Sequence, residues 1–330
     1  MKIAVCTKVN HIEIQEQTLP EIDCHQVLLK VSICGICGSD LAAWQGSEHK
    51  KYPYTPGHEF CGTIEKVGKD VVGFHIGQRV VIDPNLGCGE CRFCRMGKPN
   101  ICDFLKTRPV KSNGGFAEYV ALDYRMVYHL PDKIEDDLAP FIEPLSCALY
   151  AARSAKVKSR EKVVIFGGGL MGMLTGVALK SSKAGIILVE PAKNRRESAG
   201  RLLNIKAFSL SEIKESNLVG KIDVAIEYSG SAHALSQAIR ILRKAGRIVL
   251  AGLIMDPKAA DISLIDVTTR ELEIRGVWLN PNTFEEAIRL TIEYKNILQQ
   301  LKTEVFRLDN IVAALERALQ QDVNKVFVKP

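Results

Sequence analysis

Long apolar runs, aromatic side chains and dense basic clusters are all scarce in this sequence. There is no run of about eighteen apolar residues, so no membrane-spanning helix is expected. Aromatic residues make up only 6% of the chain, which argues against the basic, aromatic-rich surface typical of nucleic-acid binding. The opening residues, MKIAVCTKVN, lack the apolar core of a signal peptide. We therefore expect a cytoplasmic protein with neither nucleic acid nor a membrane as partner.

The length and composition indicate two ordinary globular domains. The chain has 330 residues, which is long for a single hydrophobic core. Hydrophobic residues make up 46% and charged residues 25%, and the formal net charge is +6. These values are typical of a folded protein with a mildly basic surface.

The pattern of elements changes along the chain. About the first 140 residues contain short strands such as Val27–Ile33 and Arg79–Ile82, which glycine and proline separate. From Lys162 onward, apolar strands alternate with helices, as in a parallel sheet covered on both faces. The last expected strand, Lys325–Val328, is predicted to return to the first domain. We predict a β-rich domain from residues 1–145 and 296–330, and an α/β domain from residues 146–295.

Four of the ten cysteines lie in one short segment, GCGECRFCRMGKPNIC, with the spacing C-x2-C-x2-C-x7-C. In a reducing cytosol this crowding indicates a metal site and not disulfides. The two-residue gaps let consecutive thiolates surround one ion, and four thiolates leave no coordination position open. The sequence therefore predicts a structural zinc site, with an iron–sulfur cluster as the alternative, at Cys88, Cys91, Cys94 and Cys102.

Two glycine-flanked segments carry a second set of candidate ligands. The segment ICGICGSD contains Cys34 and Cys37, and the segment PGHEFCG contains His58 and Glu59. Glu143 lies in the apolar stretch FIEPL, where a carboxylate is costly unless a metal ion or a polar partner faces it. Thiolate, imidazole and carboxylate together suit a second metal ion.

These segments occur together in one known family. GICGSD, GHEFCG, the four-cysteine segment, GGFAEY and IEPLS resemble the motifs of zinc-containing medium-chain dehydrogenases/reductases. The resemblance covers essentially the whole chain, and it favours the sorbitol and other polyol dehydrogenases because a glutamate occupies the region of the third ligand. It implies a GroES-like catalytic domain and a Rossmann coenzyme domain with a doubly wound parallel sheet.

By that resemblance, Cys37 and His58 are ligands of a catalytic zinc. Glu59 and Glu143 complete or flank the coordination sphere, and either one can ligate the ion or hold the water bound to it. The sequence does not decide between them. Cys34 is expected to be a small buried residue.

The resemblance also implies a route for the proton. Ser39 corresponds to the family's relay hydroxyl, and Asp40 is expected to support the ligands. Many relatives have a histidine three residues after the relay position, whereas this chain has Ala42. His49, the cofactor ribose or water are the candidates to replace that histidine.

A glycine-rich turn follows the strand Val163–Phe166. Its pattern is G-x-G-x-x-G, and in a strand–turn–helix context it predicts a site where the helix amino terminus faces a pyrophosphate. The turn is formed by Gly167, Gly169, Leu170, Met171 and Gly172.

The acid at the end of the next strand predicts which dinucleotide binds. A carboxylate at Glu190 can accept hydrogen bonds from the ribose hydroxyls and repels a 2′-phosphate, so NAD is favoured over NADP. Arg195, five residues later, matches a familiar NAD arrangement in polyol dehydrogenases. Ser229 and Gly252 follow later strands and are expected to flank the dinucleotide.

The expected function is hydride transfer from a secondary hydroxyl of a polyol or sugar alcohol to NAD, with two zinc ions per chain. The alternatives are an amino-alcohol dehydrogenase, acting on a threonine-like substrate or an aminocyclitol, and a non-catalytic NAD(H)-binding zinc protein. The segment Leu272–Trp278 resembles the edge strand that joins subunits in relatives, so a homodimer or homotetramer is expected.

Overall fold

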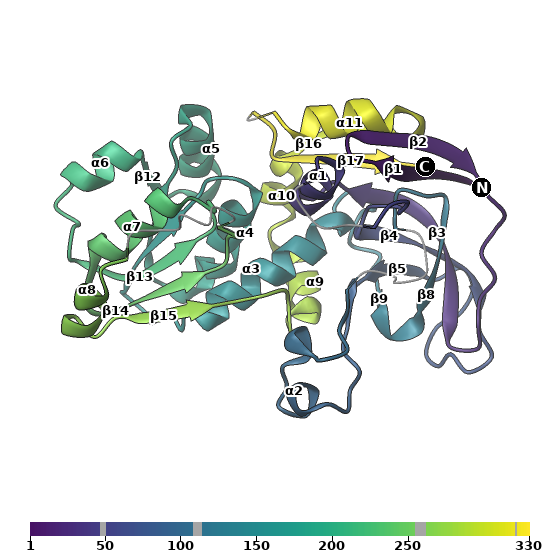
Figure 1. The fold of residues 1–330 in the computed structure, drawn as a ribbon, viewed down its shortest axis with the longest axis horizontal. Helices are drawn as coiled ribbons and strands as arrows, with labels where there is room; N and C mark the ends of the chain where they lie inside the picture. Colours follow the sequence, from purple (N-terminus) through teal and green to yellow (C-terminus); the bar gives the residue numbers. More distant parts are fainter. Residues whose placement is uncertain (47–50, 108–113, 255–261, 321) are drawn as a thin grey trace. The chain divides into compact units, whose positions relative to one another are not determined.

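The computed structural model describes residues 1–46, 51–107, 114–254, 262–320 and 322–330. The chain forms two compact units, Met1–Pro144 with Phe284–Pro330, and Leu145–Thr283 (Figure 1). The predicted first boundary, at 145/146, lies one residue from the observed one. The predicted second boundary, at 295/296, lies twelve residues after the observed one, which falls between Thr283 and Phe284. The reason is that α9 (Phe284–Glu293) belongs to the first unit, where the ring of Phe284 lies 4.6 Å from that of Tyr128.

The first unit is built mainly from antiparallel strands. Its largest sheet has the order β16-β17-β3-β4-β5-β9, and β8 also pairs with β3. The strands of this sheet are β3 (Gln26–Gly35), β4 (Glu59–Val67), β5 (Arg79–Ile82), β8 (Tyr119–Asp123), β9 (Val127–His129), β16 (Lys302–Arg307) and β17 (Lys325–Lys329). Two small sheets pair β1 (Lys2–Lys8) with β2 (His11–Glu16) and β6 (Asn85–Leu86) with β7 (Lys106–Thr107). The last strand, β17, joins the first unit, as the sequence predicts.

Short helices complete the first unit. They are α1 (Gly38–Trp44), α2 (Arg92–Arg95), α9, α10 (Lys295–Leu301) and α11 (Ile311–Ala318), and α3 (Ile142–Ser154) begins in this unit. The core lies against the inner faces of the strands and contains Val27, Leu29, Phe60, Phe116 and Val328, each at most 1% exposed. The pattern of buried residues in β3 follows its apolar sequence, VLLKVSIC, so this strand lies in the middle of the sheet.

The second unit is a six-stranded parallel sheet with the order β12-β11-β10-β13-β14-β15. The strands are β10 (Lys162–Phe166), β11 (Gly185–Val189), β12 (Lys206–Phe208), β13 (Ile222–Glu227), β14 (Leu242–Leu250) and β15 (Glu273–Gly276). The helices between them are α4 (Leu170–Leu179), α5 (Lys193–Leu203), α6 (Leu210–Glu215), α7 (Ala232–Ile241) and α8 (Leu264–Thr269). The first strand in sequence lies between β11 and β13, so the strand order reverses there, as in a Rossmann fold.

Both faces of this sheet are covered. Val164 and Phe166 of β10 pack into one buried cluster, whereas Val163 and Ile165 pack into another. Successive side chains of a strand point to opposite faces, so the two clusters lie on opposite sides of the sheet. This explains why these strands are continuously apolar in sequence. Among the described residues, no helix is both long and apolar enough to cross a membrane.

Candidate functional site

The four-cysteine segment folds into a compact loop around the short helix α2. The sulfur atoms of the four residues lie within 4.8 Å of one another, at Cys88, Cys91, Cys94 and Cys102. Backbone amides point at these sulfurs. The amide of Cys91 donates to Cys88 Sγ at 3.3 Å, and the amide of Cys88 donates to Cys102 Sγ at 3.3 Å. Hydrogen bonds of this kind stabilise thiolates, and the backbone amide of Cys94 lowers the pKa of the Cys91 thiol to about 6. The donor set fits a closed tetrahedral zinc site.

A second cluster brings together Cys37, His58 and Glu59. Each offers a ligand atom, and these atoms lie within 4.8 Å of one another. Cys37 follows the carboxyl end of β3, and Glu59 begins β4. The two strands are antiparallel, with Gly35 directly opposite Glu59. The pairing therefore places two segments that are distant in sequence at the same end of the sheet.

Asp40 links the segment that contains Cys37 to the segment that contains His58. Its carboxylate accepts the backbone amide of Cys37 at 3.0 Å and that of Gly57 at 3.1 Å. His58 Nδ1 lies 3.4 Å from Asp40 Oδ1, and the Asp40 side chain is fully buried. A carboxylate behind a ligating histidine fixes the orientation of its ring.

The charges around His58 oppose the effect of its burial. Burial alone would lower the pKa of the imidazole, but Asp40 and Cys37 outweigh it and raise that pKa well above its ordinary value. The acidic neighbours of His58 therefore favour positive charge at this position, which a bound cation would also supply.

Lys325 is the residue of this site that the sequence analysis missed. Its ammonium pairs with the carboxylate of Glu59 and donates to the carbonyl of Ile36 at 2.9 Å. The side chains of Lys325 and Glu59 are only 2% and 1% exposed. Although burial disfavours the charged amine, Glu59 keeps its pKa above the ordinary value. The one sequence signal was a lysine opening the apolar strand KVFV, and its partners lie almost three hundred residues earlier in the chain.

Glu143 lies on the first turn of α3 and is 7% exposed. Burial raises its pKa to about 7, although the charge of His58 opposes this rise. Its carboxylate is therefore within electrostatic reach of the cluster but does not belong to the closely spaced group. Glu59, in contrast, is in that group but already pairs with a buried lysine.

The remaining residues of the predicted catalytic site lie on or beside α1. Ser39 is half-buried in the first turn of α1, two residues after Cys37, and Ala42 is half-buried one turn later. Cys34 is completely buried in β3, as predicted. His49 lies outside the described residues.

In the second unit, the glycine-rich turn connects β10 to α4. Gly167 has φ +103°, a conformation that favours glycine. A side chain at Gly172 would place its Cβ 1.9 Å from the carbonyl oxygen of Gly167, so only glycine fits there. Gly169 immediately precedes the first turn of α4, which begins with Leu170 and Met171. The turn therefore exposes the helix amino terminus at the carboxyl edge of the sheet, where α/β folds bind dinucleotides.

Glu190 lies beside this turn and is 6% exposed. One carboxylate oxygen accepts the amide of Gly168 at 2.7 Å, and the other accepts the amide of Ala192 at 2.9 Å. The guanidinium of Arg195 is close as well, since its Nη1 lies 3.9 Å from where a Cβ on Gly169 would stand. The acid and the arginine predicted from sequence thus both border the turn.

Glu227 organises the neighbouring loops, and the sequence analysis did not single it out. It is fully buried at the end of β13, and its carboxylate accepts the backbone amides of Ser229 at 2.6 Å and Gly230 at 3.1 Å. A Cβ on Gly252 would stand 2.8 Å from Glu227 Oε2. The loops that carry Ser229 and Gly252 are therefore both in close contact with the Glu227 carboxylate.

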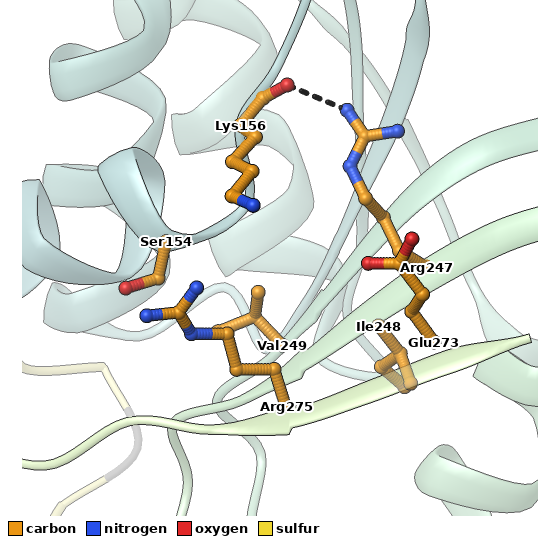
Figure 2. A pocket seen from close by; sticks show the side chains of 7 residues that line it. All are labelled: Ser154, Lys156, Arg247, Ile248, Val249, Glu273 and Arg275. Carbon is orange, nitrogen blue, oxygen red and sulfur yellow. Dashed lines mark hydrogen bonds between the residues drawn. The ribbon is translucent and has the colours of Figure 1, made fainter.

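A small cavity in the second unit does not belong to the nucleotide edge (Figure 2). Arg247 and Glu273 lie where the paired parts of β14 and β15 begin, at the opposite end of these strands from Leu250. The cavity has a volume of about 30 Å³, which suits one water molecule and is too small for a cofactor. It is lined by Ser154, Lys156, Arg247, Ile248, Val249, Glu273 and Arg275.

Comparison with known families gives two matches. Residues 23–132 match the alcohol dehydrogenase GroES-like domain, and residues 171–293 match the zinc-binding dehydrogenase domain. Each match lies largely within one of the two structural units. The sorbitol dehydrogenase of Bacillus subtilis strain 168 is 32% identical over 348 residues, covering 100% of this chain and 97% of the relative.

Solved structures give the same result. An alcohol dehydrogenase from Escherichia coli CFT073, complexed with NADH, has a TM-score of 0.91 and 28% identity, covering 100% of this chain and 99% of that one. A protein assigned as a zinc-binding dehydrogenase from Sinorhizobium meliloti 1021, bound to NADP, has a TM-score of 0.90, 28% identity and the same coverage. Similar structures therefore include complexes with either dinucleotide.

The crowding at Gly172 yields a prediction for nucleotide binding. Gly172→Ala should weaken NADH binding at least about tenfold, because the new methyl group collides with the carbonyl of Gly167 and displaces the turn. Gly200→Ala is the matched control, since this glycine is also helical and its Cβ would meet only an ordinary contact at 3.5 Å. Fluorescence titration with NADH measures both, and equal affinities in the two variants would contradict the role of the turn.

Proposed function

Because the chain belongs to the zinc-containing medium-chain dehydrogenase/reductase family, we propose that it transfers a hydride from a secondary hydroxyl of a polyol or sugar alcohol to NAD. The observation that carries the proposal is the buried cluster of Cys37, His58 and a carboxylate. Such a donor set holds zinc with one position open for a substrate. The polyol class is supported by the glutamate at the third-ligand region and by the similarity to a sorbitol dehydrogenase.

Within this site each residue has a distinct task. Zinc, when bound there, acts as a Lewis acid that polarises the substrate hydroxyl and lowers its pKa by several units. Cys37 and His58 would hold the ion, and Asp40 orients the imidazole and the Cys37 backbone. Lys325 neutralises Glu59, so the pair contributes no net charge next to the ion.

The carboxylate that completes the site is Glu143 in this proposal. Lys325 already pairs with Glu59, whereas Glu143 is outside that pair, is 7% exposed and lies close enough to His58 for the imidazole charge to affect its pKa. Glu143 would complete the set of ligands or support it through a hydrogen bond. Glu59 supports the site from behind together with Lys325.

Proton removal begins at Ser39. Its hydroxyl can accept the proton of the substrate and pass it on, as the corresponding hydroxyl does in the family. Ala42 has no titratable group to take the next step, so His49, a ribose hydroxyl of the cofactor or water completes the route. In this proposal the proton does not leave through a histidine of α1.

The preferred cofactor in this proposal is NAD. The Glu190 carboxylate lies against the glycine turn, where it can accept hydrogen bonds from both ribose hydroxyls. A 2′-phosphate would meet this buried negative charge at close range. Arg195 borders the same turn and can contact the pyrophosphate.

The count of two zinc ions per chain is also part of the proposal. One ion is structural and belongs to the four-cysteine loop, whose thiols leave no open position.

A cytoplasmic location is a further part of the proposal. None of the ten cysteines forms a disulfide, which fits a reducing cytoplasm, and fractionation of the expressing cells tests that location.

The zinc count can be measured after gel filtration in zinc-free buffer. We expect the native chain to retain about two tightly held zinc ions in this buffer and Cys37→Ser to retain about one, because the substitution removes a ligand only from the catalytic site. Cys34→Ser is the control and should keep both ions, since Cys34 is buried outside the cluster. Elemental analysis showing one ion in both native protein and Cys37→Ser would support a non-catalytic protein that binds only structural zinc.

A substrate screen tests the reaction itself. Polyols, aldoses, amino alcohols and simple alcohols are mixed with NAD or NADP, and reduction of the dinucleotide is followed by absorbance. The expected result is turnover of one or more polyols with NAD preferred. Turnover only of amino alcohols contradicts the substrate class, and a preference for NADP contradicts the role of Glu190.

The edge strand β15 supports an oligomer. It is the last strand of the parallel sheet and its four residues are exposed. An exposed edge strand offers unpaired backbone groups to a second copy, so we propose that β15 pairs two chains. Light scattering should give at least twice the chain mass of 36.5 kDa, and a stable monomer would exclude this pairing.

A further inference from the structure

A third group of metal-ligating side chains lies outside both zinc sites described above. It consists of Cys24, His25 and Asp70, whose ligand atoms all lie within 4.8 Å of one another. Cys24 is half-buried, whereas the side chains of His25 and Asp70 are 62% and 46% exposed. His25 Nε2 and Asp70 Oδ2 are 3.9 Å apart. Neither the reaction nor the four-cysteine loop uses any of these residues.

Two backbone segments bring the three ligands together. Cys24 and His25 immediately precede β3, and Asp70 follows β4, whose last residue, Val67, pairs with Val27. The amide of Asp70 donates to the carbonyl of Cys24 at 2.9 Å. The sheet thus fixes both segments at the same end of the β3–β4 pair.

The close approach of these segments depends on Gly68. A Cβ at this position would stand 2.4 Å from the carbonyl oxygen of Asp23 and 2.6 Å from that of Cys24. The amide of Gly68 donates to the carbonyl of Gln26 at 2.8 Å. Asp23 in turn accepts the amide of His25 at 2.8 Å, which orders the start of the ligand segment. The backbone geometry is therefore set before any ion arrives.

The donor set is the one that zinc favours. Tetrahedral zinc with bonds of about 2.0–2.3 Å separates its ligand atoms by roughly 3.3–3.8 Å. The ligand atoms of Cys24, His25 and Asp70 lie within 4.8 Å of one another, so they need to approach by only about 1–1.5 Å to match that spacing. Thiolate, imidazole and carboxylate would fill three positions, and the exposure of His25 leaves the fourth to water.

We propose that Cys24, His25 and Asp70 form a third site, which binds a zinc-like divalent cation and links the segment before β3 to the segment after β4. The site is remote from the catalytic cluster, because the ten residues of β3 span about 30 Å between them. It does not depend on the dehydrogenase activity. Loss of the third site would leave the proposed reaction intact. Failure of the proposed reaction would likewise leave the third site unaffected.

Alkylation of Cys24 tests the site directly. Native protein, desalted to keep its tightly held metal, is treated with iodoacetamide with and without added zinc chloride, and the modified Cys24 peptide is measured by mass spectrometry. Added zinc should slow alkylation of Cys24 at least about tenfold, because a metal-bound thiolate is a poor nucleophile. An unchanged rate in the native protein would overturn the proposal.

Variants distinguish a shared site from zinc binding to one thiol. His25→Ala and Asp70→Ala should each lose most of the protection. His75→Ala, which removes an exposed histidine outside the three ligands, should keep it. Equal protection in all three variants would show that Cys24 binds zinc without these partners and would contradict the site. Zinc titration of Cys24→Ser should show about one equivalent fewer than the native chain, and an unchanged count would contradict it as well.

Discussion

The antiparallel pairing of β3 with β4 is the constraint that brings together two of the three groups of potential metal ligands among the described residues. At one end, the pairing of Gly35 with Glu59 places Cys37 beside His58. At the other end, the pairing of Val27 with Val67 places Cys24 and His25 beside Asp70. A shift in register of one residue would turn every side chain of the strand to the other face. The hydrophobic residues of β3 resist that shift because most of them are buried in the sheet core.

The cluster of Cys37, His58 and Glu59 also lies among several buried charges. Asp40, Glu59 and Lys325 are almost completely buried, and each charge is compensated by a neighbour or by backbone amides. Removing one partner of such a pair commonly costs about 3–5 kcal/mol, because the other charge stays buried alone. The charges therefore hold the ligand segments in one arrangement. A side chain at Gly35 would displace the Glu59–Lys325 pair, since its Cβ would stand 2.5 Å from Glu59 Oε2.

Local sequence patterns predicted most of the fold and the ligand segments. The glycine turn, the four-cysteine segment and the alternating strands of the second unit each carry their signal within a few dozen residues. Lys325 and Glu227 escaped prediction because their roles come from tertiary contacts. Lys325 meets Glu59 only through the pairing of β17 with β3, and Glu227 acts by ordering loops after two strands. The helix α9 was assigned to the coenzyme domain for a similar reason, since its amphipathic sequence does not reveal which unit it packs against.

The most direct test of the account is the rate of NADH formation with a reactive polyol, before and after zinc is removed with a chelator and then returned. Elemental analysis of the same samples verifies the zinc content. The account predicts that the rate falls with the loss of zinc and recovers when zinc is restored, because the proposed mechanism assigns acidification of the substrate hydroxyl to zinc bound by Cys37 and His58. A rate that stays unchanged in protein shown to have lost its zinc would contradict it.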